Sequence, residues 1–212
     1  MNVKKRLRVV MLALLLLLLL PVQLSASAEE IYPGTGYQLR WGVVNGSGRR
    51  WIKVDDSHMA AGTCYSPSIV QSALRNWTNA GTKALCTDAG SITYSNVDLS
   101  TASDSWWDEH CDDYVNAQAV AYVNQQPIIN FSDLQAAASP GRVNVTYAAI
   151  MFNPKDPLGG WQNSYINTVM HEIGHVYGMG HTGDPNSLMY KVNTSVISLN
   201  SYDIGVMNSF YP

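Results

Sequence analysis

The feature that most constrains this chain is a run of eleven residues that reads His171-Glu172-Ile173-Gly174-His175-Val176-Tyr177-Gly178-Met179-Gly180-His181. In an α-helix, side chains four residues apart lie on one face, about 6 Å apart along the axis. His171 and His175 can therefore direct ring nitrogens toward one ion. Glu172 would lie beside that ion rather than on it. This spacing is typical of a helix that carries two metal ligands and a general base.

The third histidine of the run requires the helix to end before it. His181 follows His175 by six residues, which is out of phase on a helix. Gly178 allows the chain to turn, because glycine tolerates the left-handed conformation that ends many helices. Three protein ligands and one open position are typical of a catalytic zinc ion. We predict one catalytic Zn²⁺ bound by His171, His175 and His181, with Glu172 as the general base.

The N-terminal segment has the organisation of an export signal. Basic residues between Lys4 and Arg8 precede an apolar run, Val9–Leu20, and the small residues Ala26–Ala28 follow. The apolar run is shorter than the roughly 20 residues that a membrane span needs. We therefore predict a signal peptide over 1–28 and a secreted, extracellular catalytic domain over 29–212. An uncleaved membrane anchor is the alternative.

The charge of the predicted mature domain narrows the class of partner. Removal of the signal peptide takes away four of the 13 basic residues and none of the 16 acidic residues, which leaves a net charge of −7. Such a chain is a poor ligand for nucleic acid or for an anionic membrane surface. We expect a monomer whose partner is a protein or peptide substrate.

Periodicity and turn residues predict an α+β fold, with strands and helices early in the chain and helices late. The predicted strands are Tyr37–Val44 and Arg50–Val54, which would pair around the turn Asn45–Gly48, and then Ser91–Val97, Ala117–Asn124 and Val143–Phe152. The predicted helices run from Pro67, capped by Ser66, to near Gly81, from near Asn163 through the motif, and from Ser201 to Tyr211. An apolar stripe on the second helix should bury it and hold the motif rigid: Tyr165, Ile166, Val169, Met170, Ile173, Val176 and Tyr177.

Two further groups of residues could bind metal or form a bridge. The three cysteines are Cys64, Cys86 and Cys111, so at most one intramolecular disulfide can form. We favour a bridge between Cys64 and Cys86. The other two pairings and a cysteine-containing zinc site are the alternatives. An acidic cluster should form a solvated loop, with a calcium site as the alternative that its spacing does not support: Asp104, Asp108, Glu109, Asp112 and Asp113.

The eleven-residue motif resembles that of the metzincin clan of zinc peptidases. The segments His181–Tyr190, which contains Met189, and Leu199–Ile204 resemble the matrixin family within that clan. The resemblance implies a metzincin-like zincin domain with a twisted mixed sheet, an active-site helix and a C-terminal helix. It also implies that Met189 forms a turn beneath the zinc and that Ala117–Asn124 is an edge strand that pairs with substrate.

The resemblance further implies that Tyr190–Leu199 forms the wall of the pocket for the side chain just after the scissile bond. Val192, Val196 and Ile197 suggest that this pocket is apolar. No cysteine precedes Cys64, so we do not expect control by a cysteine in a pro-segment. Relatives of the astacin type use a tyrosine as an extra ligand where this chain has Lys191, so we assign Tyr190 no catalytic role.

Together these features predict a secreted zinc endopeptidase. It would hydrolyse internal peptide bonds of extracellular proteins by a zinc-activated water, with Glu172 as the base. A catalytically silent zinc-binding or adhesive module is one alternative, although such forms usually lose the glutamate or a ligand. A hydrolase of cell-wall peptide amides is the other.

Overall fold

The structure is a computed structural model that describes residues 35–42, 50–59, 65–90, 95–112, 114–155 and 158–211. The predicted signal peptide, the turn 45–48, Cys64 and Asp113 lie outside these residues. The strands are β1 (Tyr37–Trp41), β2 (Arg50–His58), β3 (Ala84–Asp88), β4 (Val97–Thr101), β5 (Ala117–Val123), β6 (Gln126–Ile128), β7 (Gly141–Val145) and β8 (Tyr147–Phe152). The helices are α2 (Pro67–Asn79), α3 (Asp104–His110), α4 (Phe131–Ala137), α5 (Gln162–Val176) and α6 (Ser201–Phe210).

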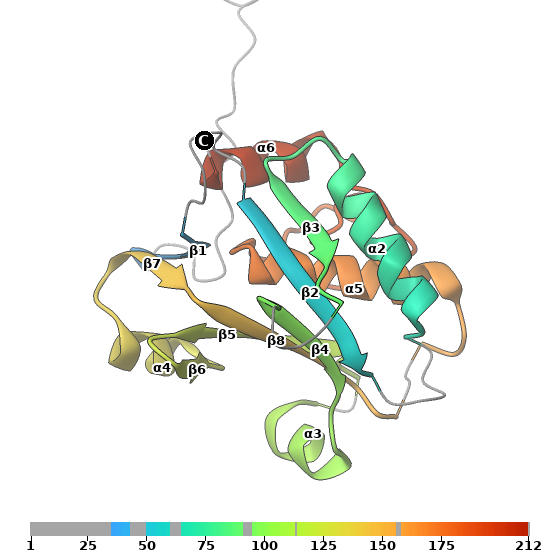
Figure 1. The fold of residues 1–212 in the computed structure, drawn as a ribbon, viewed down its shortest axis with the longest axis horizontal. Coiled ribbons are helices and arrows are strands. Elements are labelled where there is room, and N and C mark those ends of the chain that lie inside the picture. The colour runs from blue at the N-terminus through green and yellow to red at the C-terminus, as the bar shows by residue number, and fades with distance from the viewer. Residues whose placement is uncertain are drawn as a thin grey trace, which may run out of the picture.

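Six strands form a mixed sheet in the order β3-β2-β4-β8-β5-β6. The strands β3, β2, β4 and β8 are parallel to one another, whereas β5 is antiparallel to both β8 and β6. In Figure 1 the strand direction turns progressively across the sheet from β3 to β5. The predicted α+β fold with a twisted mixed sheet is confirmed.

The predicted hairpin between the first two strands is wrong. β1 pairs in parallel with β7, with Tyr37 opposite Gly141 and Trp41 opposite Val145, while β2 lies between β3 and β4. Alternate side chains of β1 are all buried, and so are Val143 and Val145 of β7. Burial of these two apolar faces favours the long-range pairing, which no local turn signal reveals.

Three other strand predictions need correction. Of the strand predicted over Ser91–Val97, residues 91–94 lie outside the described residues. The strand β4 begins at Val97 and continues to Thr101, because Val97 and Leu99 pack fully buried between β2 and β8. The range Val143–Phe152 divides at Thr146, whose N–H and hydroxyl both donate to the carbonyl oxygen of Tyr122. β3 was not predicted, since only its first three residues are buried.

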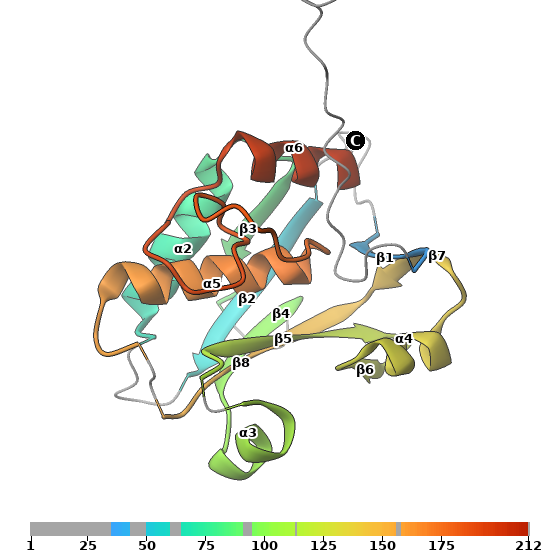
Figure 2. The same cartoon turned by 180° about the vertical axis from the view of Figure 1, so that it is seen from behind.

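Helices α2 and α5 cover one face of the sheet, and α5 lies in front of it in Figure 2. Pro67 occupies the first turn of α2, as predicted, and Ser66 is its N-cap residue. The Ser66 hydroxyl does not cap the helix, because it contacts the hydroxyl of Ser68 at 2.9 Å instead. The predicted apolar stripe of α5 is buried throughout, which confirms that the motif lies on a buried helix.

The predicted disulfide is not formed, because Cys86 and Cys111 are free thiols. Cys86 is buried beside the hydroxyl of Tyr177, which donates to the carbonyl oxygen of Leu85 at 2.6 Å. Burial raises the pKa of the Cys86 thiol far above its usual value. Cys86 therefore behaves as an inert core residue.

The predicted acidic loop is instead the short helix α3. The Ser103 side chain accepts a hydrogen bond from the N–H of Trp106, and Trp107 is fully buried. Among the residues described, the only group arranged to hold a metal ion is His171, His175 and His181. The calcium alternative therefore gains no support.

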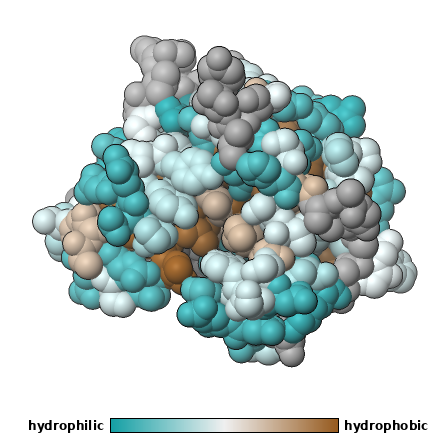
Figure 3. Space-filling model, turned by 60° about the horizontal axis from the view of Figure 1, so that its bottom comes forward, coloured by the Kyte–Doolittle hydropathy of each residue, from teal (hydrophilic) through white to brown (hydrophobic). Residues whose placement is uncertain are grey.

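The opposite face of the sheet is partly open. Beside α3, apolar side chains line a hollow, and Figure 3 shows such side chains exposed between two polar lobes. The hollow is bordered by Trp106, Val120, Tyr122, Pro127, Ile129, Ala149 and Met151. Within the described ranges, no helix is long and apolar enough to cross a membrane.

Candidate metal centre and active site

The three histidines of the motif meet at the end of α5. The helix ends at Val176, and Gly178 then turns the chain with φ of +98°. The N–H groups of Gly178 and Met179 satisfy the carbonyl oxygens of His175 and Gly174 at 2.9 Å. This turn returns His181 to the face that carries His171 and His175, as the sequence predicted.

The arrangement of the imidazole nitrogens fits a zinc ion. The Nε2 atom of His181 lies 3.1 Å from the Nε2 atoms of both His171 and His175. The Nδ1 atoms of His171 and His175 lie 2.9 and 2.8 Å from the carbonyl oxygens of Leu188 and Met179. Because a carbonyl can only accept, both Nδ1 atoms carry the proton and the Nε2 lone pairs converge.

Converging lone pairs would repel one another without a cation between them. Tetrahedral zinc with Zn–N distances of about 2.0–2.1 Å places its ligand atoms about 3.3 Å apart, close to the separation observed. Burial lowers the pKa of His171 to about 4 and that of His175 well below its usual value. Burial also lowers the pKa of His181. All three side chains are thus neutral at neutral pH, which is the form that binds zinc.

Glu172 lies beside the triad rather than within it. Its side chain lines the same cavity as the histidines and is only 6% exposed. Burial raises its pKa to about 8, while a hydrogen bond from the backbone of Ala119 acts in the opposite direction. A cation at the triad would favour the carboxylate. The residue is therefore placed to accept a proton in the cleft.

Met189 lies directly beneath the motif helix, as the resemblance implied. Its side chain is 1% exposed, and a Cβ atom added to Gly174 would lie 2.3 Å from its sulfur. Glycine at position 174 is therefore what allows the Met189 turn to approach the helix.

A buried carboxylate that sequence reasoning missed holds this turn in place. Asp203 of α6 accepts hydrogen bonds from the Ser187 hydroxyl at 2.5 Å and from the Leu188 N–H at 3.0 Å. The Leu188 carbonyl is the group that orients His171. The available signal was the pair Asn200 and Asp203, which forms a capping box at the start of α6.

Replacement of Asp203 should weaken the metal site from a distance. We expect Asp203→Ala to lower zinc affinity by about 10–100-fold, the usual effect of losing a group that orients a ligand. Asp133→Ala is the matched control, because Asp133 forms the equivalent capping box of α4 away from the triad. It should cost about 1 kcal/mol of stability and leave zinc affinity unchanged. Zinc titration against a competing chelator measures both; equal affinities in the two variants would contradict this role.

A cavity of about 780 Å³ opens above the triad, between β5, α5 and residues 190–193. The predicted edge strand is β5, although it is not the last strand of the sheet. β6 pairs only with its residues 121–123, so within the described sheet residues 117–120 have no strand on that side. A segment that could pair with an extended peptide therefore runs along the cleft.

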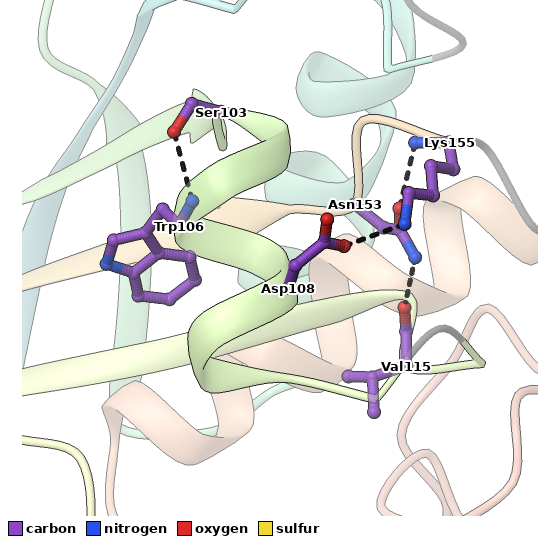
Figure 4. A network of polar contacts seen from close by, with 6 residues as sticks. All are labelled: Ser103, Trp106, Asp108, Val115, Asn153 and Lys155. Carbon is purple, nitrogen blue, oxygen red and sulfur yellow. Dashed lines mark hydrogen bonds and ion pairs between the residues drawn. The ribbon is translucent and has the colours of Figure 1, made fainter.

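The rim of the cleft before β5 is fixed by a network of polar contacts (Figure 4). Asn153, at the end of β8, donates through its side chain to the Val115 carbonyl at 2.7 Å and through its backbone to the Asn116 carbonyl at 3.0 Å. An ion pair of 2.8 Å between Lys155 and Asp108 connects the loop that follows β8 to α3. Asn153 is 4% exposed, so this attachment is part of the packed structure.

Three converging histidines, a buried carboxylate beside them and an extended cleft above define the site of a zinc peptidase. The model of the matrixin peptidase family matches residues 66–212. The chain therefore belongs to the matrixin family, as the resemblance of its motifs indicated. The family implies zinc, and the triad fits that ion.

Two other comparisons complete these findings. One solved structure, described as the crystal structure of myroilysin, is similar at 15% sequence identity with a TM-score of 0.44, covering 82% of this chain and 90% of that one. No curated protein matches the chain.

Proposed function

We propose that this protein is a secreted zinc endopeptidase that hydrolyses internal peptide bonds of extracellular proteins, after export directed by residues 1–28. The observation that carries the proposal is that Glu172 is buried and lines the same cavity as three convergent histidines and residues 117–119 of β5. A binding module would not need a buried carboxylate beside its metal ligands. The net negative charge of the predicted mature domain disfavours binding to nucleic acid or to an anionic membrane, and we propose that the domain acts as a monomer.

Zinc bound by His171, His175 and His181 supplies a Lewis acid that polarises the scissile carbonyl and makes a water molecule more acidic. Residues 117–120 of β5 hold the substrate extended by main-chain hydrogen bonds. Glu172, held by the N–H of Ala119, accepts the proton of the attacking water and passes it to the leaving amine. No covalent bond to the protein forms in this scheme.

Loss of one ligand should remove metal and activity together. We expect wild-type protein to bind one zinc ion, and His175→Ala to lose both the ion and cleavage of casein. His110→Ala is the control, since His110 is exposed and stacks on Trp106 away from the cavity. Metal analysis measures the zinc content of each variant, and a protease assay with and without chelator measures casein cleavage. Cleavage that persists after chelation would contradict the proposal, and a zinc-loaded protein that cleaves no peptide would favour the silent binding module.

A hydrolase of cell-wall peptide amides remains the second candidate. It shares the triad and the base, so the same assay with cell-wall peptides in place of casein separates the two. If the enzyme prefers those peptides, its substrates are cell-wall peptide amides rather than proteins.

A further inference from the structure

Polar side chains line the cleft about one helical turn before His171. Asn167 and Thr168 lie on α5 one turn before His171, and they line the cavity together with Asn193 of the loop that follows Met189. Asn167 and Thr168 are only 2% and 3% exposed. By family resemblance, this loop forms the wall of the pocket for the side chain just after the scissile bond. The three residues therefore lie at the end of that pocket.

Hydrogen bonds join the helix to the loop at this position. The side-chain amide of Asn193 donates to the Thr168 hydroxyl at 2.7 Å, to the backbone carbonyl of Ser164 at 3.1 Å and to the side-chain Oδ1 of Asn167 at 3.2 Å. Asn167 in turn donates to the Val196 carbonyl at 2.7 Å. Helix and loop are therefore in hydrogen-bonding contact about one helical turn before His171.

Of the three residues that suggested an apolar pocket, only Val192 lines the described cavity. Val192 lines the cavity but is 55% exposed, so its side chain lies largely in solvent. Val196 and Ile197 are absent from the described lining, and their carbonyl oxygens accept from Asn167 and Asn76. Amide and hydroxyl groups therefore contribute to this part of the cleft wall.

We propose that Asn193, clamped to Thr168 and Asn167, closes the pocket and makes the enzyme select short side chains just after the scissile bond. This inference rests on the proposed peptidase function. A long apolar side chain would have to displace Asn193 and break its hydrogen bonds to Thr168, Ser164 and Asn167 without replacing them. Alanine and serine fit without that loss. Asn193 is thus a specificity-determining residue.

The test uses peptides that are identical except for alanine, serine, leucine or phenylalanine after the scissile bond. Wild-type enzyme should cleave the alanine and serine peptides with kcat/KM at least about tenfold above the other two. Asn193→Ala should open the pocket and shift the ratio toward leucine by about tenfold. Asn144→Ala is the matched control, because Asn144 is exposed on β7 and does not line the cavity; it should leave the ratio unchanged.

A second measurement is independent of turnover. Hydroxamates that bear the same four side chains can be titrated against zinc-loaded Glu172→Gln protein with and without Asn193→Ala. If Asn193→Ala fails to fold, Thr168→Val is the alternative variant, because valine has the shape of threonine but cannot accept the hydrogen bond from Asn193. It should shift the kcat/KM ratio and the hydroxamate affinity ratio in the same direction as expected for Asn193→Ala. Thermal unfolding identifies the folded variants.

The outcomes separate the two proposals. Wild-type preference for leucine or phenylalanine, or an unchanged ratio in folded Asn193→Ala protein, overturns the role of Asn193 while the peptidase function stands. If wild-type protein cleaves none of the peptides nor casein, the peptidase function fails, and the hydroxamate series alone decides the pocket. If the hydroxamates with short side chains then bind more tightly than those with long ones, and Asn193→Ala reverses this preference, the proposed role of Asn193 is still supported.

Discussion

Replacement of Glu172 by glutamine should lower kcat/KM for peptide hydrolysis by about 10²–10⁴-fold, the usual contribution of a general base. Glutamine keeps the shape and can still accept the hydrogen bond from the backbone of Ala119, but it cannot take a proton from water. The three histidines are untouched by the change. Zinc content should therefore stay at the wild-type value.

Glu109→Gln is the matched control for this experiment. Glu109 lies exposed on α3, so the same chemical change there should leave kcat/KM within about twofold, as for most surface substitutions. Activity and zinc content are measured on the same preparations. Substantial proteolysis by zinc-loaded Glu172→Gln protein would show that another group acts as the base.

Alanine in place of Gly178 should destabilise the fold and disrupt the metal site together. A Cβ atom at this position would lie 2.2 Å from the backbone oxygen of Leu39, and φ is +98°. The strained backbone costs about 1–3 kcal/mol, and displacement of β1 costs about 1–3 kcal/mol more. Because this turn carries His181 back to the triad, zinc affinity should fall as well.

Gly205→Ala tests whether these losses come from the position rather than from the substitution. Gly205 lies in α6 and is exposed to solvent, and no atom lies within 4 Å of an added Cβ atom. Alanine there should stabilise the protein by about 0.5–1 kcal/mol because it restricts the unfolded chain. Chemical unfolding and zinc titration compare the two variants. A Gly178→Ala protein with wild-type stability would mean that the turn after α5 is not close to β1.

Several elements were predictable because their signals are local. The stripe from Tyr165 to Tyr177 repeats with the helical period, so α5 could be placed within one residue of its start. Pro67 and the stripe that follows it marked α2 in the same way. The triad and Glu172 followed from helical spacing and one glycine turn.

Strand pairing was not predictable in this way. β1 and β2 carry a turn-like sequence between them, yet β1 pairs with β7 and β2 with β3 and β4, and alternate side chains of β1 are buried by its pairing and packing. The strand β4 likewise extends to Thr101, past the predicted end at Val97. Strand pairing depends on which faces meet in three dimensions, and periodicity within one segment does not contain that information.

By itself, the sequence determined which residues can bind zinc and which can act as the base, since these depend on residue type and on spacing within one helix and its turn. Only the tertiary structure decided what surrounds them. Asp203 reaches the Met189 turn from another helix, Ala119 reaches Glu172 from a strand, and Asn193 closes the pocket from a loop. Each of these contacts joins segments that are far apart or structurally separate, so each exists only once the chain has packed.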